Sequence, residues 1–172
     1  PVVQSLRKAT DLFLDTHLMI TDPLNYVEPF VKAGADLITF HLESNSDPEA
    51  VIEKLRELGC KVGLAINPDT PVEKAYPLLD RVDMLLVMTI YPGFGGQKFM
   101  PETADKVAQA AAYRQEKGLD FLIEVDGGIN PETAGVAAGH GAEVLVAGSA
   151  VYGKSDYAAA IRSIREAAAA GK

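Results

Sequence analysis

The stretch DLITFHLESNSDPEAVIEKLRELGCKVGLAI, residues 36–66, decides the fold class of this chain. It contains an apolar, β-branched run at 36–42, a helical pattern at 48–58 and a second apolar run at 61–66. A proline stands just inside the helical pattern and a glycine just beyond it, as is typical of helix boundaries. A strand, a helix and a strand in this order indicate two parallel strands joined by a crossover helix.

The same alternation continues in both directions along the chain. We predict strands at 12–20, 36–42, 61–66, 83–90, 121–125 and 143–147. We predict helices at 2–9, 24–33, 48–58, 72–79, 101–117, 131–139 and 157–170. The strands recur about every 26 residues, so eight such units would need about 210 residues. The predicted fold class is therefore α/β, a (β/α)8 TIM-barrel type with only six βα strands present.

Composition restricts the classes of partner. The chain has 172 residues, a net charge of −8, 48% hydrophobic residues and one cysteine, which describes a single globular domain over residues 1–172. The acidic balance argues against nucleic-acid partners and anionic membrane surfaces, and no apolar run approaches the ~20 residues of a membrane span. A lone Cys60 fits the reducing cytoplasm, although a chain that starts at Pro1 leaves a removed organelle-targeting leader open. Association into a homo-oligomer is also left open.

Polar side chains gather where the predicted strands end, the position of active sites in parallel barrels. Period-two alternation places Asp15, His17 and Met19 on one face of their strand, and Glu124 and Asp126 on one face of theirs. If both faces point inward, the imidazole of His17 and the carboxylate of Asp126 converge, as metal or substrate binding requires. The alternative for a single strand histidine is a buried, hydrogen-bonded core residue.

The other histidines and the cysteine fit supporting roles. His41 and Glu43 are expected to be hydrogen-bonding partners behind the site. His140 lies between two glycines and is expected at a helix end. Cys60 precedes a strand, at the end of the sheet away from the chemistry.

Two glycine turns follow the last two predicted strands. Gly127 and Gly128 follow Asp126, and Gly148 and Ser149 follow the next strand. Barrels commonly bind phosphate at these positions, where glycines allow close backbone approach and a short helix at 149–152 presents N–H groups. We therefore predict a phosphorylated small molecule as the ligand, the alternative being two ordinary glycine turns.

The segment YPGFGGQ at 91–97 lengthens one strand-to-strand interval and is a candidate lid. Its residues Gly93, Phe94, Gly95 and Gly96 would fold over the ligand and donate N–H groups to the phosphate. The alternative is a flexible connection without a role in binding.

Several motifs in register resemble the ribulose-phosphate 3-epimerase family over residues 1 to about 153. They are DTHLMI at 15–20, AGAD at 33–36, TFHLE at 39–43, NPDTP at 67–71, MTIYPGFGGQKF at 88–99, VDGGI at 125–129 and VAGSA at 146–150. Tyr91 departs from the acidic or small residue expected at its position.

The resemblance implies an isomerase that interconverts D-ribulose 5-phosphate and D-xylulose 5-phosphate, so that the ligand is a phosphorylated ketopentose. It implies one divalent metal ion (Zn, Fe, Mn or Co), held by two histidines and two aspartates, with the aspartates also serving as acid and base. His17 and Asp126 match one metal ligand of each type, Asp126 matches a catalytic carboxylate, and His17 also contacts substrate. Met19 and Met88 match methionines that cushion the enediolate.

The first strand, first helix and second strand of the family, with its other His-x-Asp pair, have no counterpart in the sequence. The resemblance thus implies one phosphosugar-binding barrel domain that lacks two strands, with low activity for the isolated 172-residue chain. Two alternatives are another phosphosugar barrel enzyme, such as an allulose-6-phosphate epimerase or a related decarboxylase, and a non-catalytic phosphosugar-binding fragment.

Overall fold

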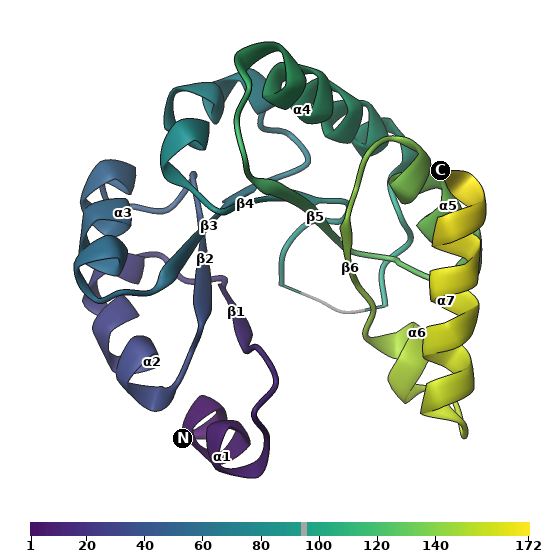
Figure 1. The fold of residues 1–172 in the computed structure, drawn as a ribbon, viewed down its shortest axis with the longest axis horizontal. Helices are drawn as coiled ribbons and strands as arrows, with labels where there is room; N and C mark the ends of the chain where they lie inside the picture. Colours follow the sequence, from purple (N-terminus) through teal and green to yellow (C-terminus); the bar gives the residue numbers. More distant parts are fainter. Residues whose placement is uncertain (94–95) are drawn as a thin grey trace.

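The computed structural model describes residues 1–93 and 96–172 as a curved parallel sheet with helices on its outer face (Figure 1). The strands are β1 (Asp15–Leu18), β2 (Leu37–His41), β3 (Lys61–Ile66), β4 (Met84–Met88), β5 (Leu122–Asp126) and β6 (Val144–Val146). The α-helices are α1 (Val2–Ala9), α2 (Val27–Ala33), α3 (Pro48–Glu57), α4 (Ala104–Lys117), α5 (Pro131–Gly139), α6 (Ser149–Tyr152) and α7 (Tyr157–Gly171). Short 3-10 turns lie at Pro23–Asn25, Val72–Lys74, Tyr76–Arg81 and Pro101–Thr103. The predicted fold class, a parallel α/β barrel type with six strands, is confirmed.

One predicted helix is wrong in type. The segment at 72–79 forms two 3-10 turns, Val72–Lys74 and Tyr76–Arg81, instead of one α-helix. Pro77 lies inside this segment. A proline has no N–H to donate along an α-helix, and it disfavours the α conformation of the residue before it.

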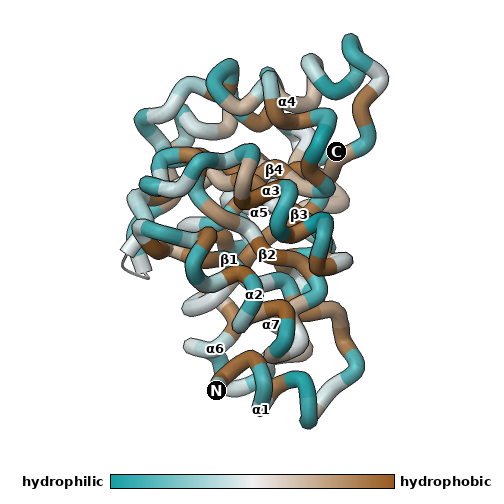
Figure 2. Tube along the Cα trace, turned by 90° about the vertical axis from the view of Figure 1, so that its left-hand side faces the viewer, coloured by the Kyte–Doolittle hydropathy of each residue, from teal (hydrophilic) through white to brown (hydrophobic). Residues whose placement is uncertain are grey.

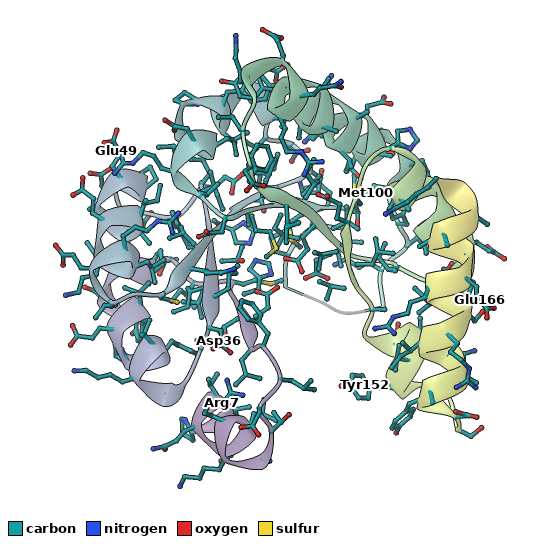
Figure 3. All side chains as sticks on the ribbon, in the orientation of Figure 1. Arg7, Asp36, Glu49, Met100, Tyr152 and Glu166 are labelled. Atoms are coloured by element: carbon teal, nitrogen blue, oxygen red, sulfur yellow. The ribbon has the colours of Figure 1, made fainter. Side chains whose placement is uncertain are left out.

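The strands follow the order of the sequence across the sheet, β1-β2-β3-β4-β5-β6, and every pairing is parallel. Neither β1 nor β6 pairs on its outer side with another described strand. The sheet is therefore an open ring, whose opening separates α1 and β1 from β6 and α6 (Figure 1). Tyr152 of α6, which is 74% exposed, points toward this opening (Figure 3).

The hydrophobic core fills the space between the strands and the outer helices. Alternate strand residues, among them Ile38, Phe40, Leu64, Leu85 and Ile123, point outward into it and are fully buried. Figure 2 shows hydrophobic stretches along the central strands. The alternation leaves the other strand residues facing the inside of the ring, and the functional candidates are among them.

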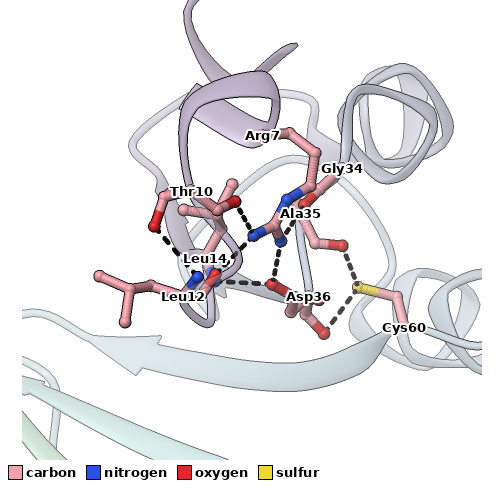
Figure 4. Close-up of polar contacts among 8 residues, drawn as sticks. All are labelled: Arg7, Thr10, Leu12, Leu14, Gly34, Ala35, Asp36 and Cys60. Carbon is pink, nitrogen blue, oxygen red and sulfur yellow. Dashed lines mark hydrogen bonds and ion pairs between the residues drawn. The ribbon is translucent and has the colours of Figure 1, made fainter. Parts of the chain in front are cut away.

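An ionic contact holds helix α1 against the residue that precedes β2 (Figure 4). The guanidinium of Arg7 lies 2.8 Å from Asp36 Oδ2 and donates to the carbonyls of Thr10 and Leu12 at 2.6 and 2.7 Å. Cys60 is buried beside this cluster and donates toward the Asp36 carbonyl at 3.5 Å. Cys60 thus lies where the sequence placed it, at the end of the sheet away from the polar strand ends.

Within residues 1–93 and 96–172, no helix combines the length and the apolar character needed to cross a membrane.

Candidate functional site

His17 and Asp126 meet inside the ring, although three strands separate β1 from β5 in the sheet. The curvature of the sheet brings His17 Nδ1 to 3.5 Å from Asp126 Oδ2. Both side chains are largely buried, with 15% and 22% of their surfaces exposed. His17 Nδ1 is fully buried and makes no hydrogen bond within the described part of the chain.

An unsatisfied imidazole nitrogen beside a carboxylate fits a metal ligand pair. Zinc bonds to histidine nitrogen and carboxylate oxygen are about 2.0–2.2 Å long, so one ion can contact two such atoms that lie 3.5 Å apart. The same buried nitrogen would otherwise carry an uncompensated desolvation cost. Among the described residues, no group of three or more His, Cys, Asp or Glu side chains could hold a metal ion. Among the described residues, His17 and Asp126 thus have the spacing of a ligand pair, which would be half of the set that the family resemblance implies.

A chain of hydrogen bonds lies behind His17. Its Nε2 is 2.8 Å from His41 Nε2, and the two rings stack with their centroids 4.9 Å apart. His41 Nδ1 is 3.3 Å from Glu43 Oε2. The expectation that His41 and Glu43 are hydrogen-bonding partners is met by this geometry.

The other oxygen of Glu43 is tied to the loop after β3. Glu43 Oε1 accepts the backbone N–H of Asn67 at 2.8 Å and also the hydroxyl of Thr70. Lys106 of α4 holds the same loop by donating to the carbonyls of Asn67 and Thr70, at 3.1 and 2.7 Å, and to that of Pro68. This loop thus fixes the position of the Glu43 carboxylate.

These contacts control the charge of Glu43. Burial raises the pKa of its carboxyl, but hydrogen bonds from His41, Asn67 and Thr70 outweigh burial and lower the pKa to about 2. Near neutral pH, Glu43 is therefore an ionised acceptor.

The lowered pKa of Glu43 predicts a pH-dependent contribution to stability. Because the folded pKa is below the ordinary carboxyl value, this stability is present above about pH 4.5 and is lost as pH falls toward 2. Allowing for solvent screening, we expect about 1–2 kcal/mol less unfolding free energy at about pH 3 than at about pH 7 from this group. Urea unfolding at the two pH values measures it, and the loss should shrink by this amount in Glu43→Gln but not in the exposed Glu49→Gln. If the unchanged protein, Glu43→Gln and Glu49→Gln all lost the same unfolding free energy between the two pH values, Glu43 would not be the source of this pH dependence.

A pair of carboxyl groups, those of Asp15 and Glu124, lies deeper in the ring. Burial, together with the charges of Asp15 and Asp126, raises the pKa of Glu124 to about 9, and a hydrogen bond joins it to Asp15. Burial also raises the pKa of Asp15. Glu124 therefore keeps its proton at neutral pH and is not available as a base.

The glycine turn after β5 has a fixed shape. Gly127 and Gly128 have φ angles of 131° and 66°, in the region that favours glycine. The Thr89 hydroxyl donates to the Gly127 carbonyl at 2.6 Å, and the Thr133 hydroxyl donates to the Gly128 carbonyl at 2.8 Å. A Cβ on Gly127 would lie 2.5 Å from Ile90 Cγ1. The turn therefore places no side chain of its own between its backbone and a bound ligand.

Three of the predicted phosphate-binding residues line one cavity. Gly96, Gly128 and Ser149 lie in the wall of a cavity of about 960 Å³, which also includes Lys98 and Lys154. Ser149 begins α6, as the sequence predicted. Glu132 and Asp156 line the same cavity, so its charged side chains balance, and the glycine turn is the feature of the lining that suits an anion.

Of the other predicted residues that the structure describes, none is in the lining of this cavity. Gly93 lines a smaller cavity of about 280 Å³ with Met19, His41 and Glu43. Met88 is buried on β4, in register with Asp126. Gly148 precedes α6. Phe94 and Gly95 of the predicted lid lie outside the described residues.

Other contacts were not found by sequence reasoning. Asn67, Thr70 and Lys106 support Glu43 from a loop and a helix far along the chain, and the NPDTP motif was the only signal near them. The hydroxyl of Tyr91 donates to Asp69 at 2.7 Å, so this departure from the expected motif joins the start of the lid segment to the same loop. His140 ends α5, as expected.

Known proteins resemble the chain over most of its length. A model of the ribulose-phosphate 3 epimerase family matches residues 1–152. The cytoplasmic isoform of ribulose-phosphate 3-epimerase from Oryza sativa is 46% identical over 170 residues, which cover 96% of this chain and 73% of the relative. The ribulose-phosphate 3-epimerase of Bacillus subtilis is 47% identical over 165 residues, which cover 95% of this chain and 76% of the relative.

Solved structures support the fold. A 3-hexulose-6-phosphate synthase matches with a TM-score of 0.74 at 22% identity, covering 96% of this chain and 79% of the other. A 3-keto-L-gulonate-6-phosphate decarboxylase from Vibrio cholerae matches with a TM-score of 0.73 at 20% identity, covering 99% and 78%. At these identities the likeness concerns the α/β barrel fold alone.

Proposed function

This chain belongs to the ribulose-phosphate 3-epimerase family, and we propose that it acts as an isomerase at the inner strand ends, interconverting D-ribulose 5-phosphate and D-xylulose 5-phosphate. The observation that supports this most strongly is the meeting of the unsatisfied His17 Nδ1 with Asp126 at 3.5 Å. The proposed domain is a single phosphosugar-binding barrel unit over residues 1–172. The cytoplasm is the proposed location, as the name of the rice relative states for that protein.

Asp126 is the proposed proton-transfer group. Its carboxylate would take the C3 proton next to the C2 carbonyl, leaving an enediolate, and in the reverse direction would return a proton to the same face of C3. Glu124 on the same strand keeps its own proton and does not compete as a base. Return of a proton to the opposite face inverts C3, and the family resemblance assigns that role to a carboxylate of the family's second strand, which has no counterpart among residues 1–172.

His17 and Asp126 are the proposed ligands of a divalent metal ion. A nitrogen and a carboxylate oxygen accept zinc, iron, manganese or cobalt, so the donor set is compatible with each of these four. When bound, such an ion supplies positive charge next to the oxygens on which negative charge develops. The buried, unpartnered Nδ1 of His17 is the feature of this chain that fits the ion.

The phosphate would bind at the cavity that contains Gly96, Gly128 and Ser149. Backbone N–H groups of the glycine turn and the start of α6 would donate to its oxygens. The ammonium groups of Lys98 and Lys154 would partly offset the charges of the phosphate and of the two carboxylates, Glu132 and Asp156, that line the same cavity. Met19 and Met88 are the proposed apolar cushion for the enediolate, since both extend the inner face next to His17 and Asp126.

Substrate choice is the most direct test of this function. For activity measurements we define the fused chain: the N-terminal strand–helix–strand of the rice relative joined ahead of Pro1. We expect the fused chain to catalyse C3 inversion and solvent deuterium exchange with D-ribulose 5-phosphate. Its kcat/KM for this substrate should be at least about tenfold above that for D-allulose 6-phosphate, because a pocket that fits a five-carbon sugar must rearrange to admit a sixth carbon.

The opposite preference would favour a hexulose-phosphate epimerase. Binding of both phosphosugars with no deuterium exchange at C3 would favour a phosphosugar-binding protein without turnover.

A further inference from the structure

Three polar side chains, His17, His41 and Glu43, form a row of close contacts. His17 Nε2 and His41 Nε2 are 2.8 Å apart, and His41 Nδ1 and Glu43 Oε2 are 3.3 Å apart. The side chains are 15%, 8% and 27% exposed, in that order, so bulk water hardly competes for these contacts. Each contact has the geometry of a hydrogen bond and therefore needs one proton between its two atoms.

When both rings are neutral, two arrangements place one proton between the two Nε2 atoms, and they differ at the contact between His41 and Glu43. In the first, His41 Nδ1–H donates to Glu43, His17 Nε2–H donates to His41 Nε2, and His17 Nδ1 keeps a free lone pair. In the second, His41 Nε2–H donates to His17 Nε2, so the proton of His17 is on Nδ1 and the bare Nδ1 of His41 faces Glu43.

The carboxylate of Glu43 selects the first arrangement. Its Oε1 already accepts from Asn67 N–H and the Thr70 hydroxyl, so Oε2 is the oxygen that must accept from His41. In the second arrangement, a nitrogen lone pair and a carboxylate oxygen would face each other at 3.3 Å. The first arrangement also turns a lone pair, that of His17 Nδ1, toward a carboxylate oxygen, Asp126 Oδ2, but this contact is longer, at 3.5 Å, and lacks hydrogen-bond geometry. The contact between His41 and Glu43, which has hydrogen-bond geometry, therefore decides between the two arrangements.

We propose that Glu43 and His41 are positioning residues that hold His17 in the Nε2–H tautomer, so that the Nδ1 lone pair is free to bind a divalent cation beside Asp126. This inference rests on the proposed function of His17 as a metal ligand and adds the groups that prepare it. Partners of this kind, which hydrogen-bond to the far nitrogen of a ligand histidine, fix its tautomer and ring orientation. The loop at 67–70, held by Lys106, in turn fixes Glu43.

The tautomers are measurable in the metal-free chain without any activity. The chain has three histidines, so long-range ¹H–¹⁵N spectra of ¹⁵N-histidine-labelled protein at about pH 8, where a free imidazole is neutral, resolve each ring. His140 is an internal reference, because its Nδ1 lies 2.7 Å from the Val136 carbonyl, which can only accept, and so must carry a proton. We expect Nε2–H for His17 and Nδ1–H for His41. Nδ1–H on His17, or an averaged signal without preference, would overturn the proposal.

Glu43→Gln provides a second, directional test. The amide oxygen is expected to keep the bonds from Asn67 and Thr70, which places the NH₂ group against His41 Nδ1. His41 then becomes an Nε2–H donor, and His17 is expected to change to Nδ1–H. Glu49→Gln removes the same charge at an exposed carboxylate on α3 and should leave both tautomers unchanged. Unchanged tautomers in a folded Glu43→Gln protein would overturn the proposal.

Metal affinity separates this inference from the proposed function. Titration with Zn²⁺ alone should give a dissociation constant about tenfold or more higher for Glu43→Gln than for Glu49→Gln. Equal constants, with the tautomers inverted, would overturn the link between tautomer and metal binding. Absence of Zn²⁺ binding at His17 in the unchanged chain would contradict the proposed function, whereas the tautomer assignment is decided by the spectra of the metal-free protein.

Discussion

Asp126→Asn is expected to lower kcat/KM for D-ribulose 5-phosphate by roughly 10³-fold in the fused chain, because a general base in proton abstraction typically contributes 10²–10⁴-fold. An amide has nearly the same shape as the carboxylate but cannot accept the C3 proton. Solvent deuterium exchange at C3, measured alongside turnover, should fall by the same factor. Because Asp126 is also a proposed metal ligand, both proteins are compared at saturating metal, where the loss is expected mainly in kcat, since the cavity that contains Gly128 and Ser149 is unaltered.

Glu124→Gln is the matched control, on the same strand and two residues away. Glu124 is protonated at neutral pH, so glutamine reproduces its charge and shape, and we expect activity within about fivefold of the unchanged protein. If Asp126→Asn retains more than a tenth of the activity, or if Glu124→Gln loses as much as Asp126→Asn, Asp126 is not the proton-transfer group.

The second large effect is the gain in activity expected when the strands that the open ring lacks are added. On the proposed assignment, the described residues provide one ligand pair and one proton-transfer group. The 172-residue chain alone is therefore expected to epimerise D-ribulose 5-phosphate at least about 10²-fold more slowly than the fused chain. The added strands would also pair with β1 and β6, whose outer sides have no partner strand among the described residues. Steady-state assays of both proteins, at equal metal and substrate concentrations, measure the ratio.

A fused chain in which the added histidine and aspartate are both replaced by alanine separates the two effects. It should gain stability from the new strand pairs but little activity. Equal turnover by the 172-residue chain and the fused chain would show that the described residues suffice for catalysis, contrary to our account.

Much of the fold followed from periodicity. Runs such as 36–42 and 61–66 are apolar, β-branched and separated by one amphipathic helix, and β2 and β3 lie inside them. The segment at 72–79 has the same apolar spacing as a helix, but the backbone restriction at Pro77 outweighed it. The strand ends also shifted, as at β1, because pairing with β2 begins only at Asp15 and Leu37.

The candidate site was only partly predictable. That His17 and Asp126 would share the inside of the ring followed from the two-residue period of strands and the parallel order. The 2.8 Å contact between His17 and His41 depends on side-chain rotamers on neighbouring strands, about which spacing carries no information. The support of Glu43 by Lys106 joins residues 63 positions apart in the sequence, through a loop whose shape no local pattern encodes.

The most direct measurement is the anomalous diffraction of a crystal of the fused chain grown with Zn²⁺. We predict an anomalous peak about 2.1 Å from both His17 Nδ1 and a carboxylate oxygen of Asp126. A peak that contacts neither side chain, or an imidazole and a carboxylate on opposite faces of the sheet, would contradict the claim that these two residues form the reactive centre.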